Sequence, residues 1–170
     1  MDRAKSIELL NKAVADELQA VHQYMYFHFH LDDQDLQPLS LLFKRTAIEE
    51  MLHVEKLADR ILFLKGEVEM AVAGPVAKIH DPLEMLQKAM AMEDSSQEDY
   101  NASALACSAN ADAASKQLFE SLVLDEERHF DVYENEMEKF QKYGSSYIAL
   151  QSFGGGGGAA GAPGGTTPPA

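Results

Sequence analysis

An internal repeat constrains the fold of this chain more than any other feature of its sequence. The segment ELLNKAVADE at residues 8–17 aligns with EMLQKAMAME at residues 84–93, with six of ten positions identical and three conservative. The same offset of 76 residues relates Tyr24 to Tyr100, and a Glu-x-x-His motif in the first half to one in the second. The repeat therefore predicts two units of similar design that pack about a pseudo-twofold axis.

Each half contains two long segments in which apolar residues recur at steps of three and four, the period of an amphipathic helix. The first predicted helix covers 6 to about 32, with Ser6 as its N-cap. The second starts near 36 or 38 and runs to 64, where Lys65 and Gly66 provide a stop signal.

The second half has clearer boundary signals. Asp81 is a capping residue, Pro82 suits the first helical position, and Glu84 completes a capping box. This third helix is predicted to reach about residue 110. A fourth follows Asp112 to about 142, where Gly144 ends it.

The lengths of the connections predict the topology. Short breaks join the first helix to the second and the third to the fourth, so each pair is expected to form an antiparallel hairpin. The connection at 67–80 can extend over roughly 45 Å, long enough to run the length of the bundle. The chain is therefore predicted to be all-α: a four-helix bundle with a long crossover between the second and third helices and a short C-terminal fifth helix at about 145–153.

Composition divides the chain and limits its partners. Residues 1–153 are predicted to form one domain, and residues 154–170, rich in Gly and Pro, a flexible low-complexity tail. The formal net charge of −14 argues against nucleic acid and anionic membranes and favours cations. The single cysteine, Cys107, excludes an intrachain disulfide. No signal peptide or membrane span is apparent, so a soluble, cytoplasmic protein is expected.

The repeated acidic and histidine residues predict a metal centre. Residues three apart share a helix face, so Glu50 with His53, and Glu126 with His129, can each aim an oxygen and a nitrogen at one point. One carboxylate from each remaining helix completes the set of candidate metal ligands: Glu17, Glu50, His53, Glu93, Glu126 and His129. The candidate catalytic residues are these six and Tyr24. Four carboxylates balance two divalent cations, and this ligand pattern is that of di-iron and di-manganese carboxylate bundles. Residue type alone leaves Fe(II) and Mn(II) both open.

A single Glu-x-x-His motif is weak evidence for a metal site, because roughly 0.6 such motifs are expected by accident among six histidines. Two at one offset, each with an upstream Glu, are far harder to obtain by chance. Six ionisable groups in an apolar bundle would also be costly without a cation. Tyr24 and Tyr100 lie two turns beyond Glu17 and Glu93. They either pack in the core or act as hydrogen-bond or electron donors beside a ligand.

The segments IEEMLHVEKLADRILFLKG and DEERHFDVYENEMEKFQKYG resemble the bacterioferritins, haem-containing members of the ferritin superfamily. The resemblance covers about 1–153 and implies a ferroxidase centre with two Fe per subunit. Glu17 and His53 would be terminal ligands of one iron and Glu93 and His129 of the other, bridged by Glu50 and Glu126. Dioxygen or hydrogen peroxide would oxidise Fe(II), and a 24-subunit shell built from dimers would store the ferric mineral.

The same resemblance gives Met51 a role. In bacterioferritins a methionine at this position binds haem at the dimer interface, and a ferredoxin-type reductant is a possible partner for iron release. The fifth helix would lie near a fourfold axis. The chain departs from the family pattern at His22, His28 and His30, which are expected at the surface or an interface, and at Arg45, where some relatives hold further iron ligands on the inner surface.

Two other readings remain open. A di-iron or di-manganese oxidoreductase that forms no cage, such as a peroxidase or a catalase-like protein, needs the same six residues. A purely structural bundle without metal needs none of them.

Overall fold

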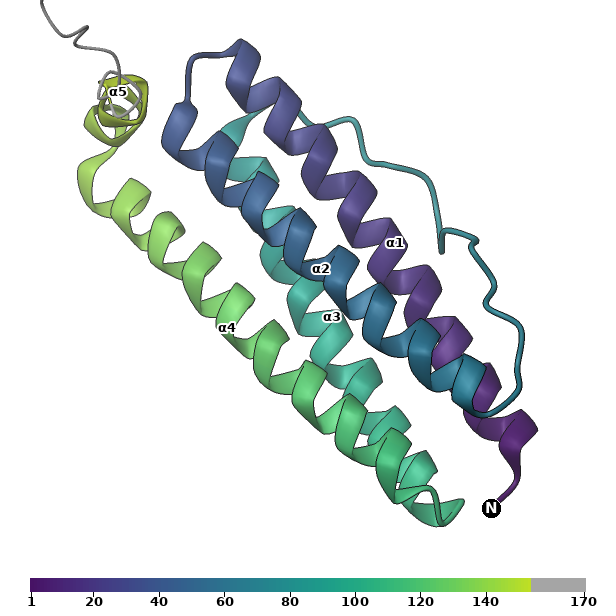
Figure 1. The fold of residues 1–170 in the computed structure, drawn as a ribbon. Helices are drawn as coiled ribbons and strands as arrows, with labels where there is room; N and C mark the ends of the chain where they lie inside the picture. The colour runs from purple at the N-terminus through teal and green to yellow at the C-terminus, as the bar shows by residue number, and fades with distance from the viewer. Residues whose placement is uncertain (154–170) are drawn as a thin grey trace, which may run out of the picture.

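The computed structural model describes residues 1–153, and they form five helices (Figure 1). Their bounds are Arg3–Asp33 for α1, Gln37–Phe63 for α2, Pro82–Ala109 for α3, Ala113–Tyr143 for α4 and Ser145–Phe153 for α5. The predicted flexible tail at 154–170 lies outside the described residues, and the division into domain and tail stays a prediction. No helix within 1–153 is long and apolar enough to cross a membrane.

The predicted topology is confirmed. Helix α1 packs along α2, and α3 along α4, as two antiparallel hairpins. The connection from α2 to α3 runs back along the outside of α1, so that α2 and α3 point in the same direction (Figure 1). Helix α5 follows α4 at the end of the bundle, where the hydroxyl of Tyr147 donates to Glu136 at 2.7 Å.

Three amide side chains of α1 hold the crossover in place. Asn11 donates to the carbonyl of Glu67 at 2.9 Å and accepts from the amide of Glu69 at 2.9 Å. Gln23, which is fully buried, makes the same two-way contact with the backbone of Ala77, at 3.0 and 2.7 Å.

Gln19 does likewise with the carbonyl of Pro75 and the amide of Gly74, both at 2.9 Å. A segment without helix or strand thereby satisfies its backbone groups against side chains.

The helix starts differ from the prediction at one point. Asp2, not Ser6, caps α1, since its carboxylate accepts from the amides of Ala4 and Lys5. Ser6 lies inside the helix, fully buried, and its hydroxyl accepts from Asn110 at 3.0 Å. Ser6 therefore contributes to the packing of one hairpin against the other, through its small size and this hydrogen bond.

At α3 the prediction holds for Asp81, whose carboxylate accepts from the amides of Leu83 and Glu84 at 3.0 Å each.

Three helices end in the same hydrogen-bonded turn, in which a left-handed residue follows the C-cap. At the end of α2, the amide of Gly66 donates to Ile61 and that of Lys65 to Leu62, both at 3.0 Å. The left-handed residue is Lys65, with φ of 67°, and not the glycine. Gly66 is needed for a different reason: a Cβ there would lie 2.8 Å from the side chain of Ile7.

Equivalent turns end α1 at Asp35 and α3 at Ala111, with φ of 57° and 56°. These two residues are again 76 positions apart, so the repeat extends to the hairpin turns.

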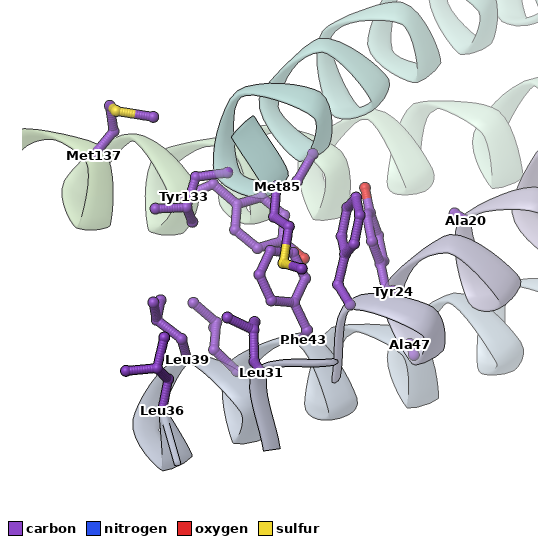
Figure 2. Packing of buried hydrophobic residues seen from close by; sticks show 14 of the residues in the cluster. Ala20, Tyr24, Leu31, Leu36, Leu39, Phe43, Ala47, Met85, Tyr133 and Met137 are labelled. Atoms are coloured by element: carbon purple, nitrogen blue, oxygen red, sulfur yellow. The ribbon is translucent and has the colours of Figure 1, made fainter. Parts of the chain in front are cut away.

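The apolar core consists of two separate clusters. One gathers around Tyr24, Phe43 and Tyr133 near the turn between α1 and α2 (Figure 2). The other lies toward the opposite end of the bundle, around Leu57 and Phe119. Along each of the four long helices, the predicted metal-binding residues lie between the residues of one cluster and those of the other. They therefore form a polar layer at mid-height in the bundle.

Replacing Ala111 by glycine is expected to stabilise the protein. The left-handed conformation destabilises the folded protein by about 1–2 kcal/mol when the residue is alanine, and glycine removes this strain. Part of the gain is offset because glycine is more flexible in the unfolded chain. We therefore expect Ala111→Gly to raise the free energy of unfolding by about 0.5–1 kcal/mol. Ala102→Gly, at an exposed position inside α3, is the matched control and should lower it by about 1 kcal/mol. Denaturant titration of the two variants measures both, and equal destabilisation would contradict the assignment of the turn.

Candidate metal centre

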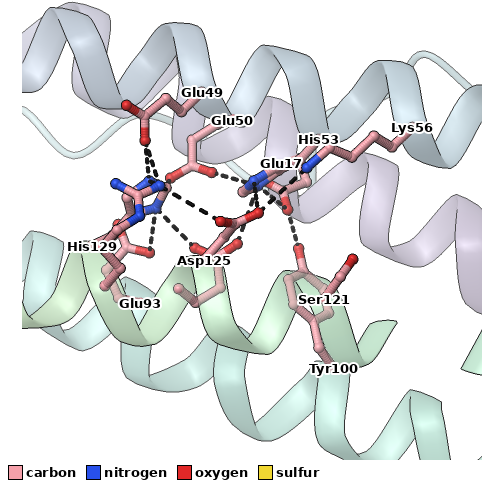
Figure 3. A network of polar contacts seen from close by, with 12 residues as sticks. Glu17, Glu49, Glu50, His53, Lys56, Glu93, Tyr100, Ser121, Asp125 and His129 are labelled. Atoms are coloured by element: carbon pink, nitrogen blue, oxygen red, sulfur yellow. Dashed lines mark hydrogen bonds and ion pairs between the residues drawn. The ribbon is translucent and has the colours of Figure 1, made fainter. Parts of the chain in front are cut away.

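Six buried side chains, one or two from each long helix, converge between the two apolar clusters (Figure 3). Each of Glu17, Glu50, His53, Glu93, Glu126 and His129 is no more than 2% exposed. Their ligand atoms form two groups whose members lie within 4.8 Å of one another, one containing Glu17 and His53 and the other Glu93 and His129. Glu50 and Glu126 belong to both groups. The predicted residues thus meet in the arrangement that the bacterioferritin resemblance implies.

The histidines face the carboxylates through Nδ1. In His53 this atom lies 2.9 Å from Glu50 and 3.2 Å from both Glu17 and Glu126. In His129 it lies 3.1 Å from Glu50, 3.3 Å from Glu126 and 3.7 Å from Glu93. Spacing of three residues along α2 and α4 aims each Glu and its His at the same point.

Two tyrosines cross between the hairpins. The hydroxyl of Tyr24 on α1 donates to Glu93 on α3, and that of Tyr100 on α3 donates to Glu17 on α1 at 2.7 Å. Burial, with the charge of the carboxylate it contacts, raises the pKa of each phenol well above its usual range. Both tyrosines are therefore neutral donors that orient a carboxylate, in addition to packing in the core.

The cluster carries more negative charge than its surroundings compensate. Burial, and then the charge of Glu50, raise the pKa of both Glu17 and Glu93 well above the usual range of a carboxyl. Burial opposes protonation of His53, but the close carboxylates of Glu126, Glu17 and Glu50 favour its charged form and raise its pKa to about 12.

For His129, burial acts in the same opposing direction, but the close carboxylates of Glu126 and Glu50 outweigh it and raise the pKa well above its usual range. The site therefore attracts positive charge, whether as protons or as metal ions.

Several buried atoms of the cluster are left without a hydrogen-bond partner within residues 1–153. They include both carboxylate oxygens of Glu50, Oε1 of Glu126 and Nδ1 of His53. Such atoms are costly unless something else satisfies them. Carboxylate oxygens and imidazole nitrogens at this spacing fit two divalent cations, with Glu50 and Glu126 able to reach both.

Two further carboxylates contact the site from its solvent side, and the sequence analysis missed them. Glu49 lies 2.8 Å from Nε2 of His129, and Asp125 lies 3.2 Å from Nε2 of His53 (Figure 3). Each orients the imidazole that the opposite hairpin supplies, as carboxylates do behind metal-binding histidines. The signal was present, since Glu49 and Asp125 are also 76 residues apart and each precedes a glutamate of the cluster.

The remaining candidate residues lie elsewhere. Met51 is 42% exposed on α2, one helical turn from Ile48, which is also exposed. His28 is buried, not at the surface as expected, and its Nδ1 lies 2.8 Å from the hydroxyl of Ser40. Arg45 is exposed.

Comparisons with known proteins agree with this geometry. A Ferritin-like domain model matches residues 7–143. The bacterioferritin of Desulfovibrio desulfuricans is 37% identical over 147 residues, covering 86% of this chain and 82% of that protein. The bacterioferritin of Rhodobacter capsulatus is 36% identical over 148 residues, covering 86% and 91%.

A crystal structure of the Desulfovibrio desulfuricans bacterioferritin, determined for its diiron site in different catalytic states, superposes with a TM-score of 0.86. The two chains are 34% identical in that alignment, which covers 95% of this chain and 96% of the other. The chain therefore belongs to the ferritin-like proteins and, among them, to the bacterioferritin family.

Proposed function

We propose that this protein stores iron and acts as a ferroxidase, oxidising Fe(II) to Fe(III) at a di-iron centre within each subunit. The observation that carries the proposal is the buried cluster of four carboxylates and two imidazoles, whose two overlapping groups each fit one cation. Glu17 and His53 would bind one iron, Glu93 and His129 the other, and Glu50 and Glu126 would bridge them.

The protein residues have defined tasks in this reaction. Glu50 and Glu126, which belong to both groups of ligand atoms, would hold two Fe(II) ions close enough to give up two electrons together. One molecule of hydrogen peroxide takes up these electrons with two protons to form two waters, or dioxygen takes them up to form peroxide. Tyr24 holds the carboxylate of Glu93, as Tyr100 holds that of Glu17, so that neither rotates away from its metal.

Storage requires an enclosed space, and we propose a shell of 24 subunits built from dimers. The family relationship supports a multimeric shell, and an exposed apolar stripe on α2, formed by Leu41, Ile48 and Met51, supports a contact between copies. A non-cage peroxidase or catalase-like protein would use the same cluster but would remain a monomer or a simple dimer.

Met51 on this stripe fits a haem-binding role. Its thioether is partly exposed among apolar neighbours, so a second copy across a twofold axis can supply a second thioether. Haem bound in this way would supply electron transfer, and a ferredoxin-type reductant would deliver the electrons that release stored iron. We further propose a cytoplasmic location.

Aerobic addition of Fe(II) tests oxidation and storage together. The protein as expressed should oxidise Fe(II) and elute as a large assembly that gains iron, while Glu50→Ala should lose two bound irons per subunit and most of the rapid oxidation, because both metal positions lose a ligand. Lys116→Gln, on the exposed surface of α4, is the control and should behave as the parent protein. A parent protein that elutes as a monomer would exclude the shell, and unchanged iron binding in Glu50→Ala would exclude the centre.

Metal binding should release protons and weaken as the pH falls. Because the pKa of His53 is raised to about 12, and that of His129 is raised as well, both imidazoles hold protons at pH 7 in the metal-free protein. Two divalent ions should therefore displace at least two protons per subunit. The apparent affinity for the pair should then drop about a hundredfold for each unit of pH decrease. Calorimetry of Co(II) binding in buffers of different ionisation enthalpy counts the protons, and a slope of zero would contradict the prediction.

Haem binding should depend on Met51. We expect the Soret absorption of the purified protein to be lost in Met51→Leu, which keeps the size and apolar character of the side chain but lacks its sulfur. Met70→Leu, a change at an exposed methionine of the crossover, is the matched control and should retain the band. An undiminished Soret band in Met51→Leu would refute the ligand assignment.

A further inference from the structure

Four charged side chains form a continuous row over the solvent side of the metal centre. Lys56 lies 3.3 Å from Asp125, Arg128 lies 3.7 Å from the other oxygen of Asp125, and the same guanidinium lies 2.7 Å from Glu49. The row runs across from α2 to α4, and it crosses the space between His53 and His129.

The two acids in this row are the carboxylates that contact the outward nitrogens of the site. Asp125 lies against Nε2 of His53 and Glu49 against Nε2 of His129, so each acid orients the histidine of one metal position. Arg128 contacts both acids and lies 3.2 Å from Nε2 of His129 as well. Among the contacts of the described residues, Arg128 therefore links Glu49, which supports His129, to Asp125, which supports His53.

Arg128 also lies where the site is accessible. A cavity of about 160 Å³ opens between α2 and α4 and is lined by Glu49, Leu52, His53, Lys56, Asp125 and Arg128. Both histidine side chains beneath it are at most 3% exposed, whereas that of Arg128 is 51% exposed. An ion that moves between the centre and this cavity must pass the imidazoles, which turn only if their carboxylate contacts are released.

We propose that Arg128 is a positioning residue that clamps both histidines through Glu49 and Asp125, and so retains bound metal in the centre against exchange through this opening. A guanidinium suits the task because its charge is spread over a broad planar head with several donors, whereas an ammonium group is a single compact charge. Here its Nη2 atom lies between the two acids, 2.7 Å from Glu49 and 3.7 Å from Asp125. Lys56 contacts Asp125 alone and supports one half of the clamp. The inference rests on the proposed metal centre and adds a residue that controls how fast its ions leave.

Release of Co(II) from the full-length protein tests the clamp without any turnover. Co(II) alone is loaded to two ions per subunit, a chelator is added in excess, and the loss of visible Co(II) absorption is followed in time. Arg128→Gln should bind the same number of ions but release them at least about tenfold faster, since loss of a residue behind a ligand commonly costs 10- to 100-fold in metal binding. Release at the parental rate would overturn the proposal.

Two controls separate bridging from charge. Lys116→Gln removes the same charge far from the row and should leave the release rate unchanged; acceleration equal to that of Arg128→Gln would overturn the proposal. Arg128→Lys keeps the charge but not the broad guanidinium head that lies between the two acids, and it should release Co(II) nearly as fast as Arg128→Gln. A parental rate in Arg128→Lys would show that charge suffices and would likewise overturn bridging.

A second variant protects the test against misfolding. Glu49→Gln weakens the support of His129 alone, so Co(II) should leave in two phases, one fast and one close to the parental rate; a single slow phase would overturn the clamp. Failure of the metal centre itself gives a different result, because the parent protein would then not bind two Co(II) ions per subunit.

Discussion

The structure depends on an imbalance of charge at its centre. Four buried carboxylates face two imidazoles, in a layer that separates two apolar clusters. Desolvation alone would make this arrangement unfavourable, and it raises the pKa of Glu17 and Glu93, while the neighbouring carboxylates raise the pKa of His53 and His129, so that all four side chains favour bound protons. Divalent cations do the same with better geometry, so that the cost of burying these groups becomes affinity for metal.

Contacts across the two hairpins make the centre a joint product of both. Tyr24 and Tyr100 each donate to a cluster glutamate of the opposite hairpin. Glu49 and Asp125 each contact the cluster histidine of the opposite hairpin. Neither hairpin alone contains a supported metal position. The pseudo-twofold arrangement would therefore couple two bound ions, because any displacement of one hairpin shifts cluster residues or their supports at both positions.

Much of this could be predicted from the sequence, for a physical reason. Helical period and the 76-residue repeat are local or translational signals, and they identified the bundle, its crossover and all six residues of the cluster. Features that depend on packing between helices were missed. Ser6 was predicted to cap α1, but it lies inside this helix, and its hydroxyl accepts a hydrogen bond from Asn110 of the other hairpin.

His28 looked like a surface residue, but Ser40 on α2 provides a buried partner. The supporting role of Glu49 was visible only in the repeat, since an acid next to an acid on a charged helix is otherwise unremarkable.

The way in which α1 holds the crossover has a consequence for the outer surface of the protein. Asn11, Gln19 and Gln23 contact only backbone groups of that segment. Side chains such as Met70 and Val72 point to solvent and carry no part of the attachment. Exposed positions of the crossover can therefore change while its path stays the same, which leaves that part of the exterior free to diversify, whereas Val68 and Ile79 are constrained because they pack against the apolar clusters.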